Sequence, residues 1–335
     1  MYADRLRMMG RMEVWAGDPN AGYASGLRLA PGELAPSYLQ WALGFARTAV
    51  VGDGIFAFNA GEFVPTRRYV AGIVTLLPLI VLHKVRGGRI VWLGAGVRGI
   101  RRGFTWPFAI IARLSDQLMW RDERSSQLMG CGGLMPDWAF ASGEEILSVE
   151  TGGRAEGSPR QRLAVALRGD RPPPSDRWIR SVRSTAARFE LEIVVVVQVA
   201  RDHVTSESLA QRLGARLHPW ATDDHWKQEQ SVRDEYRESR IVLSDRLHAL
   251  VMGATEGAIP LGWCESTSDK IARHFDVIDA SWVSPGPTDP SESLDGLDEA
   301  RLMRLGVASA NAIATARSDI DKVALQLVRH AEVGA

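Results

Sequence analysis

The 335-residue sequence has few of the residues that build metal sites, disulfide frameworks or nucleic-acid-binding surfaces. Its two cysteines, Cys131 and Cys264, form neither a zinc-ligand spacing nor a disulfide framework, which favours a reducing, cytoplasmic compartment. Lys+Arg and Asp+Glu are balanced at 40 each, so the basic excess of a bulk nucleic-acid binder is missing. No histidine pair or aspartate-rich motif has a metal-ligand spacing, and we expect neither a metal nor another cofactor.

Long apolar runs are also scarce. The longest, residues 69–82, is shorter than the roughly 20 residues that cross a bilayer, and it contains Pro78. We interpret it as a buried helix, and contact with a membrane surface is the alternative. The first 11 residues contain no apolar signal-peptide core. We therefore expect a cytoplasmic protein, with peripheral association at the inner membrane face as the second option.

Short apolar runs alternate with helical stretches along the chain, which predicts parallel sheets wrapped by helices. The chain is also long enough for two domains of roughly 150 residues each. We expect an α/β fold of two Rossmann-like domains, GT-B-like, with a long C-terminal helical segment. Ligands of such sheets bind at the carboxyl ends of strands, and in this arrangement also between the domains.

The expected boundaries follow changes in composition. The predicted strands cover residues 46–51, 89–93, 117–120, 163–167, 191–197, 240–243 and 259–262. The N-terminal domain is expected over residues 1–147, a Gly/Glu/Ser-rich linker over 148–160, the C-terminal domain over 161–290 and the helical segment over 291–335. Within the last two parts, a Pro/Ser/Asp-rich loop is expected over residues 285–297, before the long helix.

The segment Gly94-Ala95-Gly96-Val97-Arg98-Gly99 follows a predicted strand and matches the dinucleotide pattern G-x-G-x-x-G. It belongs to the middle strand of its domain rather than the first, and no acidic residue closes the next strand about 20 positions on. We therefore do not expect NAD(P). Two interpretations are left: glycines that allow a tight turn and close packing, or a ligand-facing loop of an enzyme that uses no dinucleotide.

The segment Arg121-Asp122-Glu123-Arg124-Ser125 follows a predicted strand and opens a helix. Asp122 suits the N-cap, and acidic residues stabilise the first helical turn, so helix capping alone would explain the motif. The functional alternative adds Arg121, which at a strand end would point into a ligand-binding cleft. The sequence leaves both interpretations open.

The segment Ser244-Asp245-Arg246-Leu247-His248 joins a predicted strand to a predicted helix. The amino end of a helix presents unpaired N–H groups and a partial positive charge, and so binds phosphate well. Arg246 adds a planar, bidentate donor. His248 can hold an anion or transfer a proton near neutral pH. This turn is the strongest candidate for a site that binds a phosphorylated ligand.

Taken together, several segments resemble the polysaccharide pyruvyl transferase family over roughly residues 45–280. The most specific are Arg121-Asp122-Glu123-Arg124-Ser125, similar to the family's R-D-x-x-S motif, and Arg246-Leu247-His248-Ala249, which continues to Gly257-Ala258-Ile259-Pro260. The other matching segments are residues 50–56 with Gly52 and Gly54, 93–98 with Gly94, Gly96 and Arg98, 136–140, and 165–168 with Arg168; Lys270 falls where the family often has a lysine. Asp53 and Trp138 depart from the family pattern, and residues 17–22 only echo its early G-D-x-N-x-G-D motif.

The resemblance implies a transfer of the three-carbon unit of phosphoenolpyruvate to two sugar hydroxyls, which forms a cyclic ketal and releases phosphate. It implies that Arg246 and the helix behind it hold the phosphate, that Arg121 holds the carboxylate or bridges both groups, and that His248 donates the proton or binds the leaving phosphate. Further substrate-binding residues would be Leu247, Arg168, Lys270, Gly94, Gly96, Arg98, Gly52, Gly54, Asp122 and Ser125. The acceptor would be a sugar of a polysaccharide or a lipid-linked precursor, and the sugar, the ketal position and the oligomeric state are left open.

Two other functions fit the same pattern. A GT-B glycosyltransferase would use a nucleotide-sugar, and Glu256 or Glu265 would then be the candidate ribose ligand. A non-catalytic scaffold of polysaccharide assembly is the second alternative, although a scaffold would not need paired arginine motifs.

Overall fold

The computed structural model describes residues 2–17, 20–99, 104–143, 160–266, 269–284, 286 and 288–332. The chain forms two compact units, neither of which is continuous in sequence. The first contains Met1–Asn20, Arg28–Trp138 and Asp319–Ala335, and the second contains Ala21–Leu27 and Ala139–Ser318. The expected linker over 148–160 lies outside the described residues except for Arg160.

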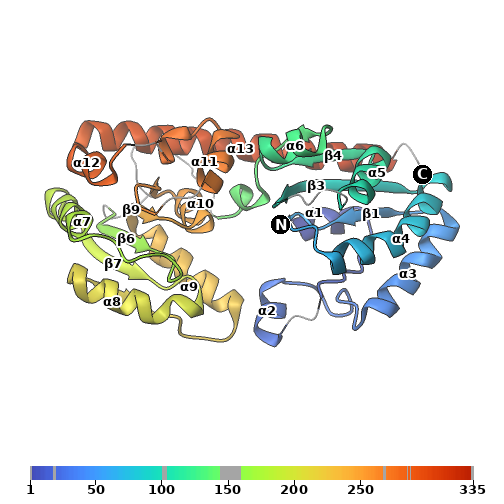
Figure 1. Ribbon diagram of the computed structural model, residues 1–335, viewed down its shortest axis with the longest axis horizontal. Helices are drawn as coiled ribbons and strands as arrows, with labels where there is room; N and C mark the ends of the chain where they lie inside the picture. Colours follow the sequence, from blue (N-terminus) through green and yellow to red (C-terminus); the bar gives the residue numbers. More distant parts are fainter. Residues whose placement is uncertain are drawn as a thin grey trace. The chain divides into compact units, whose positions relative to one another are not determined.

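The first unit is built on a parallel sheet in the order β1-β3-β4-β5, with the short β2 also paired to β3 (Figure 1). Its strands are β1 (Ile55–Phe58), β2 (Glu62–Phe63), β3 (Arg89–Val97), β4 (Gln117–Trp120) and β5 (Gly133–Leu134). Three helices, α3 (Tyr38–Val51), α4 (Arg67–Val85) and α5 (Trp106–Leu114), share one hydrophobic core with β1, β3 and β4. Phe45, Ile80 and Phe108 are among the residues that these helices contribute to the core, and Trp92 and Trp120 are among those of the sheet.

The first unit also contains α1 (Tyr2–Arg7), α6 (Glu123–Met129) and the last part of α13 (Glu299–Glu332). The Tyr2 ring lies 5.1 Å from the Trp138 ring, centroid to centroid. The side chain of Arg89, at the start of β3, donates to the Leu327 carbonyl at 3.4 Å. The amino-terminal helix and the end of α13 are therefore both tied to this unit.

The second unit is a five-stranded parallel sheet in the order β10-β9-β6-β7-β8. Its strands are β6 (Arg162–Ala166), β7 (Glu192–Val196), β8 (Arg216–His218), β9 (Ser239–Ser244) and β10 (Ile259–Leu261). Chain order reverses between β6 and β9, and such a switch point is where open α/β sheets bind ligands, at the carboxyl edge.

Alternate residues of β6 belong to two different cores. Leu163 and Val165 pack with α7 (Asp176–Arg188) and α8 (His203–Leu213), and Ala164 and Ala166 pack with α9 (His225–Arg237) and α10 (Leu247–Thr255). A strand buried on both faces explains the continuous apolar runs in this half of the sequence. The remaining elements are α2 (Ala21–Gly26), η1 (Trp138–Ala141), η2 (Ala200–Asp202), α11 (Asp269–Asp276), η3 (Ser281–Val283) and α12 (Pro290–Asp295).

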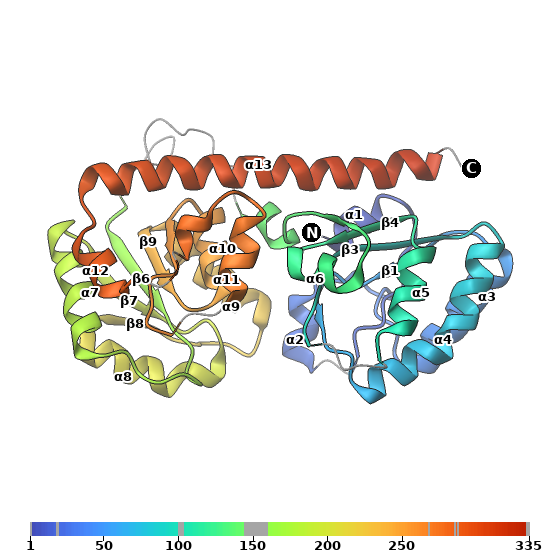
Figure 2. The same ribbon diagram turned by 45° about the horizontal axis from the view of Figure 1, so that its top comes forward.

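The predicted fold class is confirmed: both units are α/β with parallel sheets, and the chain ends in the 34-residue helix α13 (Figure 2). Two local predictions were wrong. Residues 46–51 are the end of α3 rather than a strand, because Ser37 caps a helix whose buried residues Phe45 and Ala49 have helical spacing. The loop expected over residues 285–297 contains α12, which starts at Pro290 behind the N-cap Asp289.

Candidate functional site

The turn between β9 and α10 is built around Ser244. Its hydroxyl donates to the Ala166 carbonyl at the end of β6 and accepts from the Arg246 amide at 2.9 Å, which joins the ends of two neighbouring strands. Arg246 is the N-cap of α10. A guanidinium has no acceptor for the first amides of a helix, so these amides and the positive end of the helix dipole suit an anion.

The side chains of this turn point in different directions. The Arg246 guanidinium pairs with the buried Asp202, whose other oxygen accepts from the Gly169 amide at 2.9 Å. His248 is exposed in the first turn of α10. Leu247 is buried in the core, so it offers a ligand only its main chain.

A second arginine lies beside this turn. Arg168 follows β6; its amide donates to Asp245 Oδ1 at 2.9 Å, and its guanidinium binds both oxygens of Asp170 at 2.8 and 2.6 Å. Arg168 and Asp245 line a cavity of about 440 Å³ at the carboxyl edge of the sheet. The structure therefore brings Arg168, Asp245 and Arg246 together at the switch point between β6 and β9.

Two further arginines line this cavity, Arg171 and Arg212, and neither was predicted from the sequence. Arg171 directly precedes the prolines that line one wall, and Arg212 donates to the Pro174 carbonyl at 2.8 Å and to Asp176 at 2.7 Å. The run R-P-P-P after a predicted strand was the available signal for Arg171. Arg212 comes from the end of α8 and is brought here only by the fold.

Two other residues, Cys264 and Lys270, follow β10 in the chain. Cys264 lines the cavity, and burial raises the pKa of its thiol well above the usual range, so it is present as a neutral thiol rather than a nucleophile. Lys270 lies at the start of α11, partly buried, and its carbonyl lies 2.8 Å from His274 Nδ1.

Asp245 provides a pH-dependent test of this edge. Burial raises the pKa of its carboxyl, against the opposing influence of the Arg168 amide and of the Arg246 and Arg168 charges. The folded state therefore keeps a proton that the unfolded state loses above about pH 4, and stability falls as pH rises through that interval. We expect Asp245→Asn to gain stability relative to the wild type as pH rises from about 4 towards neutrality.

The measurement is the free energy of unfolding in denaturant at a series of pH values. Asparagine retains an acceptor for the Arg168 amide, so the comparison isolates the charge. The free energy of unfolding of the variant minus that of the wild type is expected to increase with pH. A difference that is constant with pH, or that falls as pH rises, would contradict the burial of a destabilised carboxylate.

The first unit holds the other arginine motif. Arg121 follows β4 and is 4 % exposed; its Nη1 donates to Asp137 at 2.9 Å, and its Nη2 lies 3.9 Å from Glu62. Asp122 caps α6 by accepting from the Ser125 amide at 2.9 Å and from the Ser125 hydroxyl at 3.0 Å. The same hydroxyl accepts from the Val97 amide at 2.8 Å. The capping interpretation of Asp122 is thus confirmed, and Ser125 joins α6 to β3.

The glycines predicted as a loop after β3 lie inside the strand, which extends to Val97. Gly94 has φ +74°, and the register between β3 and β4 shifts beside it. A Cβ on Gly94 would lie 2.6 Å from Trp138 Cδ1, and one on Gly96 would lie 2.7 Å from Arg121 Nε. Close packing therefore requires both glycines. Arg98 is exposed just beyond the strand, and its amide donates to the Phe63 carbonyl at 2.9 Å.

The structure separates Gly52 and Gly54 from these groups. Gly52 ends α3 with φ +77°, and a Cβ there would lie 2.2 Å from the Arg86 carbonyl. The Gly54 carbonyl accepts from the amide of Arg89, the first residue of β3, at 3.1 Å. Both glycines thus lie at the amino edge of the sheet, opposite to Arg121, and the predicted strand before them was wrong. The reason is that residues 46–51 are helical.

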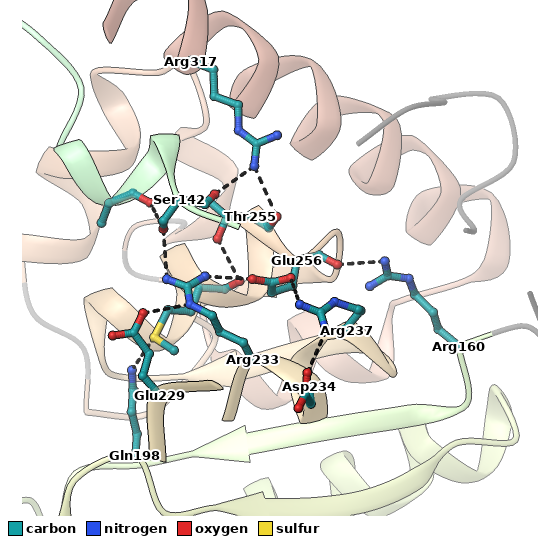
Figure 3. Close-up of polar contacts among 12 residues, drawn as sticks. Ser142, Arg160, Gln198, Glu229, Arg233, Asp234, Arg237, Thr255, Glu256 and Arg317 are labelled. Carbon is teal, nitrogen blue, oxygen red and sulfur yellow. Dashed lines mark hydrogen bonds and ion pairs between the residues drawn. The ribbon is translucent and has the colours of Figure 1, made fainter. Parts of the chain in front are cut away.

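The two glutamates considered as ribose ligands have other partners. Glu256 ends α10 and is buried; it accepts from Arg233 at 2.8 Å and from Arg237 at 3.0 Å (Figure 3). Arg233 also donates to the Ser142 hydroxyl at 3.0 Å (Figure 3). Arg317 donates to the Ser142 carbonyl at 2.9 Å (Figure 3). Glu265 follows β10 and accepts from the amide and hydroxyl of Ser175 at 2.7 and 2.5 Å.

Among the described residues, no three or more His, Cys, Asp and Glu side chains are arranged to hold a metal ion. The second sheet, with its switch point between β6 and β9, defines an α/β protein of the Rossmann-like class with an arginine-lined cavity at the carboxyl edge. More specifically, the chain belongs to the polysaccharide pyruvyl transferase family, whose model matches residues 52–258. That match includes Arg121, Arg168, Arg246 and His248 and ends before Lys270.

No curated protein sequence matches the chain. Among solved structures, the S. aureus MnaA–UDP co-structure is 11 % identical and covers 88 % of this chain and 82 % of its own, with a TM-score of 0.48. A putative UDP-N-acetylglucosamine 2-epimerase from Listeria monocytogenes is 12 % identical and covers 84 % and 75 %, with a TM-score of 0.45.

Proposed function

We propose that this transferase moves the pyruvyl group of phosphoenolpyruvate to two hydroxyls of a sugar in a polysaccharide or glycolipid precursor, and forms a cyclic ketal. The observation that carries the proposal is the family match together with the Arg246-Leu247-His248 turn at the carboxyl end of β9. An arginine and a helix amino end are the groups that a phosphate ester requires.

The reaction balances without an external oxidant or reductant. One sugar hydroxyl proton goes to the methylene carbon of the donor, which becomes a methyl group. The carbon that carried the phosphate forms two C–O bonds to the sugar, its bond to the phosphate oxygen breaks, and the second hydroxyl proton leaves with the phosphate. The protein must therefore stabilise the leaving phosphate and move protons.

The residues of the second unit suit these tasks. Arg246 and the first amides of α10 would hold the phosphate, and the partly exposed Arg168 would add a second positive charge at the same edge. His248, exposed in the first turn, is the group of this turn that can transfer a proton near neutral pH. The role of Arg121 at the donor carboxylate stays a prediction, because this arginine is buried and paired with Asp137.

The test is phosphate release from phosphoenolpyruvate in the presence of a panel of sugar acceptors, with mass spectrometry of the product. We expect release that depends on an acceptor, and a product heavier by one pyruvate ketal. Thermal shifts compare phosphoenolpyruvate with nucleotide-sugars, because a ligand at 100 times its Kd stabilises the folded protein by about 2.7 kcal/mol. Stabilisation by nucleotide-sugars alone, without phosphate release for any acceptor, would contradict the proposal.

A further inference from the structure

The outer surface of α3 and α4 is apolar although it faces solvent. On α3, Leu39, Leu43 and Val50 are 67, 53 and 55 % exposed, and on α4 Val85 is 78 % exposed. The two helices lie side by side and share one core with the same sheet (Figure 2). Because both pack on one face of this sheet, their outward sides form one surface, which we call the α3–α4 face.

Helix α4 is apolar on two sides. Ile73, Leu76 and Ile80 face the core, and Val74, Val81 and Val85 repeat at helical spacing on the exposed side. By length and composition α4 is apolar enough to cross a membrane, and 28 % of its apolar stretch is buried. Its packing against β1 and β3 fits a helix that lies on a membrane rather than one that crosses it.

The charged residues that α3 and α4 themselves contribute to this face have one sign. Neither helix contains an Asp or Glu, although the chain has 40 of them. Exposed Arg67 and Arg68 begin α4, where a cation is unfavourable to the helix dipole, so helix stability does not explain them. Arg47 lies on the exposed side of α3. The acidic groups nearby are Glu13, whose carboxylate lies against Gly44 of α3, Asp116, which pairs with Lys84, and Asp53, beyond the end of α3.

We propose that the α3–α4 face binds the surface of an anionic phospholipid bilayer. Its apolar side chains would enter the boundary between headgroups and acyl chains, and Arg47, Arg67 and Arg68 would bind lipid phosphates. A second copy of the chain would bring the same basic residues against each other, so the charges favour the lipid surface.

The experiment is co-sedimentation of the full chain with vesicles of phosphatidylcholine alone or with phosphatidylglycerol. We expect binding to the vesicles that contain phosphatidylglycerol and little to the neutral ones. Arg67→Gln with Arg68→Gln should weaken binding about 30-fold, since a basic residue near an anionic surface contributes about 1 kcal/mol. Leu39→Gln with Val85→Gln should weaken it at least about tenfold.

The matched control is Val204→Gln with Met303→Gln, which changes two residues that are 75 and 63 % exposed in the second unit. It should bind as the wild type does. The proposal is overturned if the wild type does not bind anionic vesicles, if the control loses as much binding as the test variants, or if sedimentation without lipid shows a dimer that Leu39→Gln with Val85→Gln dissociates. The arginine variant changes no core residue, and neither donor nor acceptor is present, so the outcome is independent of the pyruvyl transfer proposed above.

Discussion

Replacing Arg246 or His248 by alanine is expected to lower acceptor-dependent phosphate release from phosphoenolpyruvate by about 100-fold or more in each case. Arg246 lies at the N-cap of α10 and is held by the buried Asp202, so its charge is positioned before any ligand arrives. A preorganised charge stabilises a leaving phosphate more strongly than a mobile one, because little reorganisation is needed during the reaction.

Arg246→Ala also leaves Asp202 buried without its cation, so a loss of activity must be separated from a loss of folding. Thermal unfolding of each variant provides this check. His248→Ala serves as the second variant, since His248 is exposed and its removal leaves no cavity. Arg177→Ala is the matched control: this arginine of the same unit is 52 % exposed and pairs with Asp289 on the surface. Folded Arg246→Ala and His248→Ala proteins that release phosphate at the wild-type rate would refute the assigned roles.

Glu256→Gln is expected to lower the free energy of unfolding by about 3–5 kcal/mol, the usual cost of removing one partner from a buried ion pair. The Glu256 side chain is fully buried and accepts from both Arg233 and Arg237 (Figure 3). Glutamine has nearly the same shape but no charge, so two arginines would be left without their common anion.

The control uses a carboxylate that binds one of the same arginines at the surface. Asp234 pairs with Arg237 at 2.7 Å but is 69 % exposed, and Asp234→Asn should cost less than about 1 kcal/mol. Denaturant unfolding of both variants measures the difference. Equal losses of unfolding free energy for the two substitutions would contradict the expectation that burial makes the Glu256 ion pairs more costly to break.

Much of the second unit could be predicted from sequence because its signals are local. The apolar runs of β6, β7 and β9 are buried on both faces, so composition alone marks them as strands. Arg246 and His248 are two residues apart at a helix start, and their proximity needs no long-range contact. The first unit was harder to predict, because the apolar run over residues 46–51 fits either a strand or the last turns of a helix.

By itself the sequence determined that this protein is a parallel α/β chain with an arginine and a histidine at the amino end of a helix. These features depend on residue order and local periodicity. The tertiary structure alone decided that Asp202, 44 positions away, holds Arg246, that Arg212 reaches the cavity beside it, and that Arg121 is buried against Asp137. Each of these contacts joins residues of different chain segments, and which of many possible partners meet depends on how the sheet and its helices pack.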